Sequence, residues 1–185
     1  LTSCVKDKPN PSDAELPNSM HSGLLLIHEG AYGNNNAEIG FWDIVLQKSY
    51  SNLYQTANAK KLGDVLQSVV KIKNDYYAVL NGSNKIVVLD RQTFAEKAII
   101  TSIPSPRYIL QVSENKAYVS SLYESFIYII DVNSNKKIGA IPIPFPNTEK
   151  MLFLDGYAYI TNWDTASKSV YKLDTQTDGQ KGLVR

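Results

Sequence analysis

Short apolar runs separated by polar turns recur along most of the chain. Around residues 107–143 the runs are YILQV, KAYVS, FIYIID and KIGAIPI, and the segments between them are SEN, SLYES and VNSNK. Runs of this length, rich in Ile, Val, Tyr and Phe and bounded by turn-forming residues, predict β-strands. In FIYIID, apolar residues occupy both sets of alternating positions, which indicates a sheet packed on both faces.

This pattern is repeated. Tyr77, Tyr118 and Tyr159 stand 41 residues apart, and each is followed by an apolar strand that ends in Asp. The interval from Tyr to Asp is 13, 13 and then 15 residues, so the third copy carries a two-residue insertion. A fixed period near 40 residues is typical of an array whose units bury their faces against one another.

Four strands per repeat predict an all-β fold, a β-propeller built of four-stranded antiparallel blades, of which about four are present. Helical repeats of similar period would need apolar residues spaced by 3.6, and no window after Val69 has that spacing over more than one turn. We expect a tether over residues 1–21 and a partial propeller over residues 22–185. The expected blades are approximately 22–63, 64–103, 104–145 and 146–185.

The first repeat is degenerate. Residues 23–43 predict only the second and third strands of a blade, joined by an enlarged hairpin, and residues 13–22 contain no apolar run that would supply an inner strand. We therefore expect the missing strand to come from elsewhere in the chain, and the chain to be part of a longer propeller. Within the long link at residues 45–67, residues 58–64 could carry a helical turn.

The recurring aspartates favour a structural role over catalysis. Asp90, Asp131 and Asp174 each close the third strand of a repeat. An Asp side chain can accept hydrogen bonds from backbone N–H groups two residues on, and this arrangement stabilises a tight turn.

Composition excludes several classes of function. The 185 residues carry a formal net charge of +1 with scattered basic residues, which argues against nucleic-acid binding. One Cys and two His cannot form a Cys/His zinc site, and one Cys excludes an internal disulfide. The chain has no apolar run long enough for a transmembrane helix.

Strand direction places one group of loops on a common rim. The loop between the second and third strands of each blade returns to the same side as the start of each inner strand. The candidate ligand-binding residues on this rim are Tyr32, Asn35, Asn81, Arg107, Tyr123, Lys150, Asn162 and Trp163. Aromatic faces and amides suit a polar, ring-bearing ligand. The alternative for the asparagines is turn chemistry alone.

Catalysis finds little support in the sequence. No G-x-S-x-G motif is present, and a strand histidine in a structural role is a better interpretation of His28–Glu29 than an acid/base pair. Carboxylates at metal-ligand spacing are absent, and GNNN lacks the Gly spacing and Lys of a phosphate loop. We expect no catalytic residue, metal or cofactor.

The start of the chain resembles the lipobox of bacterial lipoproteins. Leu1-Thr2-Ser3-Cys4 precedes a polar, Pro-rich segment. The resemblance implies that Cys4 is acylated and anchors the protein to a membrane through a flexible tether. The alternative is a free cysteine near the N-terminus.

The repeats resemble those of YVTN and YncE-like seven-bladed propellers. The likeness covers residues 23–185 and rests on the second strand ending in small residues or Asn, the strand ending Ile-Asp, and VNSNKKIGAI with its Pro-rich link. Together with the lipobox and IHEGAYGNNNAEIGFWD, the chain looks like the surface propeller lipoproteins of Bacteroidetes. Some of these capture vitamin B12 above TonB-dependent outer-membrane transporters.

This resemblance implies a non-enzymatic, lipid-anchored propeller that binds a cobalamin-like ligand at the outer membrane, on the cell surface or the periplasmic face. It also implies a TonB-dependent transporter as partner. The family has seven blades, whereas this chain supplies about four. The alternatives are a protein-interaction scaffold, or an enzyme such as a propeller lyase or quinoprotein.

Overall fold

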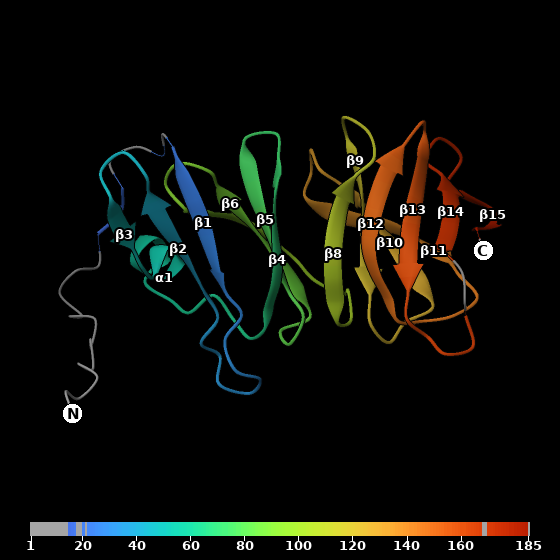
Figure 1. Cartoon of the computed structure of the whole chain (residues 1–185), viewed down its shortest axis with the longest axis horizontal. Coiled ribbons are helices and arrows are strands. Elements are labelled where there is room, and N and C mark those ends of the chain that lie inside the picture. The colour runs from blue at the N-terminus through green and yellow to red at the C-terminus, as the bar shows by residue number, and fades with distance from the viewer. Residues whose placement is uncertain (1–14, 18–19, 21, 168–169, 185) are drawn as a thin grey trace, which may run out of the picture.

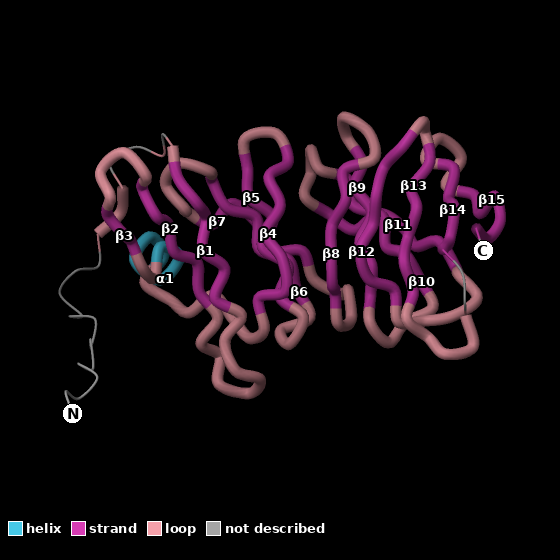
Figure 2. The backbone as a smooth tube through the Cα atoms, in the orientation of Figure 1, coloured by secondary structure: helices cyan, strands magenta, loops and turns pink. Residues whose placement is uncertain are grey.

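The computed structural model describes residues 15–17, 20, 22–167 and 170–184. Four antiparallel sheets stand side by side along the long axis of the molecule (Figures 1 and 2). The first sheet has three strands and each of the others has four, with the strands paired in chain order. These sheets are the blades of a β-propeller, as the repeat predicts.

The strand bounds are as follows. The first blade comprises β1 (Gly23–His28), β2 (Glu38–Asp43) and β3 (Lys48–Tyr50). The second comprises β4 (Leu66–Ile72), β5 (Asp75–Leu80), β6 (Lys85–Asp90) and β7 (Glu96–Ile100). The third comprises β8 (Pro106–Gln111), β9 (Lys116–Ser121), β10 (Phe126–Asp131) and β11 (Lys136–Pro142), and the fourth β12 (Thr148–Leu154), β13 (Tyr157–Asn162), β14 (Val170–Asp174) and β15 (Gly179–Val184).

An aspartate closes the third strand of every blade. Its Oδ1 accepts a hydrogen bond from the backbone N–H two residues on: Val45 to Asp43 at 2.9 Å, Gln92 to Asp90 at 3.0 Å, Asn133 to Asp131 at 2.8 Å and Gln176 to Asp174 at 2.9 Å. The predicted structural role of Asp90, Asp131 and Asp174 is therefore confirmed, and Asp43 of the first blade has the same role. Backbone N–H donors lower the pKa of the last three carboxyl groups, chiefly those of Thr93 for Asp90, Asn133 for Asp131 and Thr177 for Asp174.

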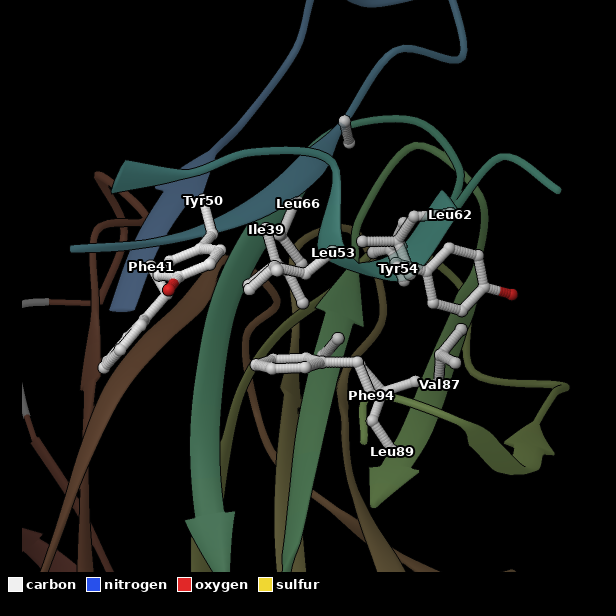
Figure 3. Packing of buried hydrophobic residues seen from close by; sticks show 13 residues of the cluster. Ile39, Phe41, Tyr50, Leu53, Tyr54, Leu62, Leu66, Val87, Leu89 and Phe94 are labelled. Atoms are coloured by element: carbon white, nitrogen blue, oxygen red, sulfur yellow. The ribbon is translucent and has the colours of Figure 1, made fainter. Parts of the chain in front are cut away.

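The core lies between the blades. Three clusters of buried apolar side chains fill the three interfaces, and Figure 3 shows the one between the first and second blades. In β10, Tyr128 and Ile130 pack toward the second blade while Ile127 and Ile129 pack toward the fourth. This confirms the prediction that both faces of the strand are apolar because its sheet has a neighbour on each side.

Buried tyrosines make polar links across two of these interfaces. The Tyr77 hydroxyl donates to Asn135 Oδ1 of the third blade at 2.5 Å, and the Tyr118 hydroxyl donates to Asp178 Oδ1 of the fourth. Burial raises the pKa of Tyr77 to about 12. Burial, followed by the hydrogen bond to Asp178, also raises the pKa of Tyr118. Both phenols therefore stay protonated and able to donate near neutral pH.

A short helix, α1 (Leu53–Asn58), lies between β3 and β4. The sequence pattern favoured a helical turn at residues 58–64, so the helix begins and ends earlier than expected. Leu53 and Tyr54 are fully buried against the first interface cluster, and this packing decides where the helix forms. Buried Glu38 accepts hydrogen bonds from the N–H groups of Tyr54 and Gln55 in the first helical turn.

The first blade lacks an inner strand among the described residues. By its register with β2, β1 is the second strand of its blade, because Gly23 pairs with Asp43 as Asp75 pairs with Asp90 in the second blade.

The described part of the chain contains no helix with the length and hydrophobicity needed to cross a bilayer. Cys4 and the predicted tether up to residue 14 lie outside the described residues.

Candidate functional site

The loop between the second and third strands of every blade lies on the same rim, at the lower edge of Figure 1. This rim carries the predicted ligand-binding residues, because β8 and β12 also begin there. We refer to the four loops, residues 29–37, 81–84, 122–125 and 163–167, together with the first residues of β4, β8 and β12, as the loop rim. The strand directions predicted from the sequence are confirmed, because these loops and strand starts lie on one rim as expected.

Three large aromatic side chains on the loop rim are exposed to solvent. Tyr32 is 83% exposed, Tyr123 is 70% exposed and Trp163 is 57% exposed. A turn does not need an aromatic side chain, and an exposed ring presents apolar area to water. Exposed rings beside polar groups can stack on flat groups of a ligand.

Trp163 is held in place by a half-buried ion pair. Its Nε1 donates to Glu149 Oε1 at 3.2 Å, and the same oxygen accepts from Arg107 Nε at 2.9 Å and Nη2 at 2.7 Å. Arg107 and Glu149 are 20% and 19% exposed, so solvent screens this pair less than it would a surface pair. The indole therefore has a fixed orientation while its ring remains open to solvent.

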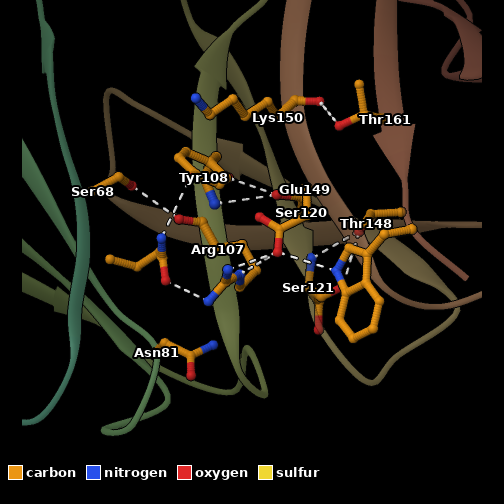
Figure 4. Close-up of polar contacts among 12 residues, drawn as sticks. Ser68, Asn81, Arg107, Tyr108, Ser120, Ser121, Thr148, Glu149, Lys150 and Thr161 are labelled. Atoms are coloured by element: carbon orange, nitrogen blue, oxygen red, sulfur yellow. Dashed lines mark hydrogen bonds and ion pairs between the residues drawn. The ribbon is translucent and has the colours of Figure 1, made fainter.

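The Arg107 guanidinium also connects three blades at their innermost strands. Its Nη1 donates to Gln67 Oε1 on β4, its own residue lies on β8, and Glu149 lies on β12 (Figure 4). Gln67 Nε2 in turn donates to the Tyr108 hydroxyl at 3.2 Å. Successive hydrogen bonds thus link Gln67, Arg107, Glu149 and Trp163 into one polar network along the loop rim.

Backbone contacts fix the position of this network. Ser68 Oγ donates to the Arg107 carbonyl oxygen at 3.0 Å, and the Tyr108 N–H donates to Ser120 Oγ at 3.1 Å. The pairing of β8 with β9 shifts register between Pro106 and Ile109. Such a bulge redirects a side chain, and here it surrounds Arg107 and Tyr108.

The other predicted residues have different surroundings. Asn81 donates to the Pro106 carbonyl at 3.3 Å, and Asn162 donates to the carbonyls of Phe145 and Pro146. Both amides hold neighbouring backbone, which is the turn-chemistry alternative for these residues. Asn35 is exposed and has a positive φ of 51°.

Lys150 is exposed at the start of β12. No hydrogen bond or ion pair of its ammonium group is found within the described residues. The structure thus brings Arg107 and Trp163 together through Glu149, leaves Tyr32, Tyr123 and Lys150 exposed on the loop rim, and places Asn81 and Asn162 in structural contacts.

Gln67 was not predicted to lie on the rim, and Glu149, which the sequence places there beside Lys150 at an inner-strand start, was not predicted as a ligand-binding residue. Glu149 is the second residue of β12 and Gln67 is the second residue of β4, as Arg107 is of β8. Aligning the repeats shows polar residues at three successive inner-strand starts, and this recurrence is the signal by which the network could have been predicted.

Other features of the molecule lie outside the loop rim. A groove of about 270 Å³ lies between the end of β7 and the start of β11, lined by Ile99–Ser102 and Asn135–Lys137, and it contains no loop-rim residue. The described residues contain no group of three or more His, Cys, Asp or Glu side chains that could hold a metal ion. His28 lies on β1 opposite Glu38, in a strand.

Several solved structures share this architecture at low sequence identity. A hydrazine synthase from Kuenenia stuttgartiensis matches with a TM-score of 0.67 and 14% identity over 80% of this chain and 43% of its own. A quinonprotein alcohol dehydrogenase-like protein from Bacteroides thetaiotaomicron matches with a TM-score of 0.62 and 14% identity, over 86% of this chain and 40% of its own. AztD from Citrobacter koseri in its apo form matches with a TM-score of 0.56 and 12% identity, over 85% of this chain and 46% of its own.

These likenesses establish the propeller fold and nothing finer, because propellers with the same architecture host unrelated functions. The chain spans less than half the length of each of these three structures. No curated protein matches it in sequence. A family model does match residues 22–180, from the first blade to the start of β15 in the fourth, and the chain therefore belongs to the family described as a domain of unknown function, DUF5074.

Proposed function

We propose that this chain is a non-enzymatic binding propeller whose loop rim captures a polar, ring-bearing small molecule of the cobalamin type. The observation that carries the proposal is the exposure of Tyr32, Tyr123 and Trp163 on three loops of one rim. Aromatic faces stack on flat ligand groups, and the polar edges of the rim supply orientation.

The polar network favours binding over a purely structural role for Trp163. Glu149 accepts three hydrogen bonds from Arg107 and Trp163, so the indole is oriented before any ligand arrives. Preorganised contacts cost less conformational entropy on binding. The ammonium group of Lys150 and the phenol of Tyr123 stand exposed on the same rim and add donors for amide or phosphate oxygens of a ligand.

The cellular setting in this proposal follows from the resemblance of the sequence. Acylation of Cys4 would anchor the propeller to the outer membrane through the Pro-rich tether, facing the cell surface or the periplasm. The captured ligand would then pass to a TonB-dependent transporter, as in the cobalamin-capturing propellers that the chain resembles.

Titration of the full chain with cyanocobalamin, followed by calorimetry and by tryptophan fluorescence, tests the proposal. We expect a saturable heat and quenching of Trp163. Trp163→Ala is expected to weaken binding about tenfold or more, a change of ~1.4 kcal/mol, because a stacked aromatic at the centre of a site is a typical hot spot. Absence of saturable heat with the wild-type chain would reject the cobalamin proposal.

Two matched variants make the test specific to the loop rim. Trp163→Phe keeps a ring and leaves Trp42 as the remaining tryptophan, so calorimetric binding should persist while most of the quench is lost. Phe153→Ala removes an aromatic that is 42% exposed near the end of β12, away from the loop rim, and should leave the affinity unchanged. Equal weakening by Phe153→Ala and Trp163→Ala would contradict a site at the loop rim.

A further inference from the structure

The outermost strands of the second and third blades enclose a groove that contains no loop-rim residue. It is lined by Ile99–Ser102 at the end of β7 and by Asn135–Lys137 at the start of β11, and its volume is about 270 Å³. Both blades have four strands and a neighbouring blade on each side, so the groove does not depend on what adjoins the first or the fourth blade. Its volume lies just below the ~300 to 1,000 Å³ of most small-molecule sites, which suits a small ligand. We call it the outer groove.

Hydrogen-bond donors line the outer groove. The Lys137 ammonium donates to the Ser102 carbonyl oxygen at 2.7 Å and lies 5.1 Å from the centre of the Tyr128 ring, so its position is fixed. An ammonium group has three N–H donors, and the bond to Ser102 uses one of them. Lys136 is exposed, and its ammonium makes no hydrogen bond or ion pair with any described residue. Thr101 and Ser102, which are also exposed, add hydroxyl groups, so the groove offers positive charge together with free N–H and O–H groups.

The Asn135 side chain adds an oriented amide donor. Its Oδ1 accepts from the Tyr77 hydroxyl at 2.5 Å, and no acceptor for its Nδ2 is found within the described part of the chain. At the equivalent position of the next interface, Asp178 accepts from Tyr118 and also pairs with the Lys116 ammonium at 2.6 Å. An amide keeps the bond to the tyrosine without a negative charge. The outer groove therefore has a donor where the next interface has a carboxylate.

The other blades show that the fold does not require this pair of lysines. The residues equivalent to Lys137 by register are Glu96 in the second blade and Gln180 in the fourth. The residues before them are Ala95 and Gly179. Strand pairing of the same kind thus forms with an acid, an amide, an alanine or a glycine at these positions. The positive charge of the outer groove needs an explanation other than strand pairing.

No carboxylate is among the described residues that line the outer groove. The acidic residue opposite Lys136 in register is Asp131, whose Oδ1 accepts the backbone N–H groups of Asn133 and Ser134. Without a carboxylate beside them in the groove, the two ammonium groups favour an anionic ligand. Hydrogen bonds between a charged donor and an oxyanion are stronger than those between neutral groups.

We propose that the outer groove binds a phosphate group, with Lys136 and Lys137 as charged donors and the Asn135 amide as an oriented neutral donor. A tetrahedral phosphate presents acceptor oxygens in several directions, so it can bond to donors of both walls at once. A carboxylate has two oxygens in one plane and satisfies fewer of them. Lysine is a common phosphate ligand, acting as a point charge. This site is separate from the loop rim and does not rest on the ligand proposed there.

Titration of the full chain with inorganic phosphate at constant ionic strength tests the proposal. Followed by ¹H–¹⁵N NMR, it should give saturable shifts of the Asn135 side-chain amide and of the Lys137 backbone amide, and acetate should give much weaker binding. Glycerol 3-phosphate distinguishes the source of the phosphate, because tighter binding than inorganic phosphate indicates an ester and equal or weaker binding indicates the free ion. Absence of saturable shifts up to tens of millimolar phosphate, or equal binding of acetate, overturns the proposal.

Matched variants assign the binding to the outer groove. Asn135→Asp keeps an acceptor for Tyr77 and brings a negative charge into the groove, so it should weaken phosphate binding at least about tenfold with an unchanged circular dichroism spectrum. Lys136→Gln should weaken it severalfold. Lys61→Gln removes the same charge from an exposed lysine outside the groove and should leave the affinity unchanged. Equal weakening by the two lysine variants would show a general attraction of anions to the chain and reject the site.

The result is independent of the cobalamin titration. Trp163→Ala, which is expected to weaken cyanocobalamin binding at the loop rim, should bind phosphate as the wild type does. Loss of phosphate binding in Trp163→Ala would place the phosphate at the loop rim and overturn a site at the outer groove.

Discussion

Asp131 ends β10 and organises the turn that follows it. Its Oδ1 accepts the backbone N–H groups of Asn133 and Ser134, and the first of these is the main reason that the pKa of the carboxyl lies below its ordinary value. The same geometry recurs at Asp90 and Asp174. A group whose pKa is lower in the folded state stabilises the fold above its unfolded pKa, and this stabilisation is lost as pH falls.

Replacing Asp131 by Asn should remove this pH dependence. Asn keeps an acceptor oxygen but no charge, so the variant should be less stable than the wild type at pH 7. The difference should shrink below the unfolded pKa of about 3.8 and vanish at lower pH, where the wild-type carboxyl is protonated. Urea denaturation at pH 7 and at pH 2.5 measures both values. Asp155→Asn, in the β12–β13 turn, is the control, and a pH-independent difference at Asp131 would contradict this role.

The residues that could be predicted from the sequence are those whose role is local or repeated. The aspartates belong here, because turn formation depends on a few neighbouring residues and recurs with the repeat. Glu149 and Gln67 could not be predicted in the same way. Their function depends on three inner strands meeting at Arg107, and no single repeat contains that information.

Helix α1 is an element that depends on tertiary contacts. Six residues are too few for a helix to be stable alone. Its N-cap residue, Asn52, makes no side-chain capping bond, and the N–H groups of Tyr54 and Gln55 donate instead to Glu38 on β2. The sequence pattern misplaced the helix because neither the cap nor the buried contacts of Leu53 and Tyr54 are local.

Removing the Glu38 side chain should destabilise the first blade. Glu38→Ala leaves buried N–H groups without acceptors, and we expect a loss of ~1 to 3 kcal/mol of unfolding free energy. Burial raises the pKa of Glu38 despite its backbone donors, so the neutral isostere Glu38→Gln should cost clearly less than Glu38→Ala. Urea denaturation measures both.

Asn52→Gly is the matched control for this prediction. It removes a side chain that makes no capping bond, and glycine tolerates the positive φ of 54° at that position. A loss equal to that of Glu38→Ala would show that the helix depends on its N-cap residue rather than on β2.

At the scale of the whole molecule, the blades form a linear array in which each sheet packs only on its neighbours. Three apolar clusters, one per interface, connect the four sheets. In such an array the stability of a blade depends on its own strand pairing and on its interfaces. The inner blades have two interfaces and four strands, and the first blade has three described strands and one described interface.

Native-state hydrogen exchange should therefore be uneven along the chain. The β1 strand pairs with β2 along one edge and has no described partner on the other, whereas β5 is paired on both edges with β4 and β6. Alternate N–H groups of β1 point away from β2. These should exchange orders of magnitude faster than the β5 amides, because they need no opening of a hydrogen bond. The measurement is amide exchange followed by mass spectrometry after proteolysis or by NMR. Equal protection of β1 and β5 would mean that a further strand pairs with β1 in solution and completes the first blade.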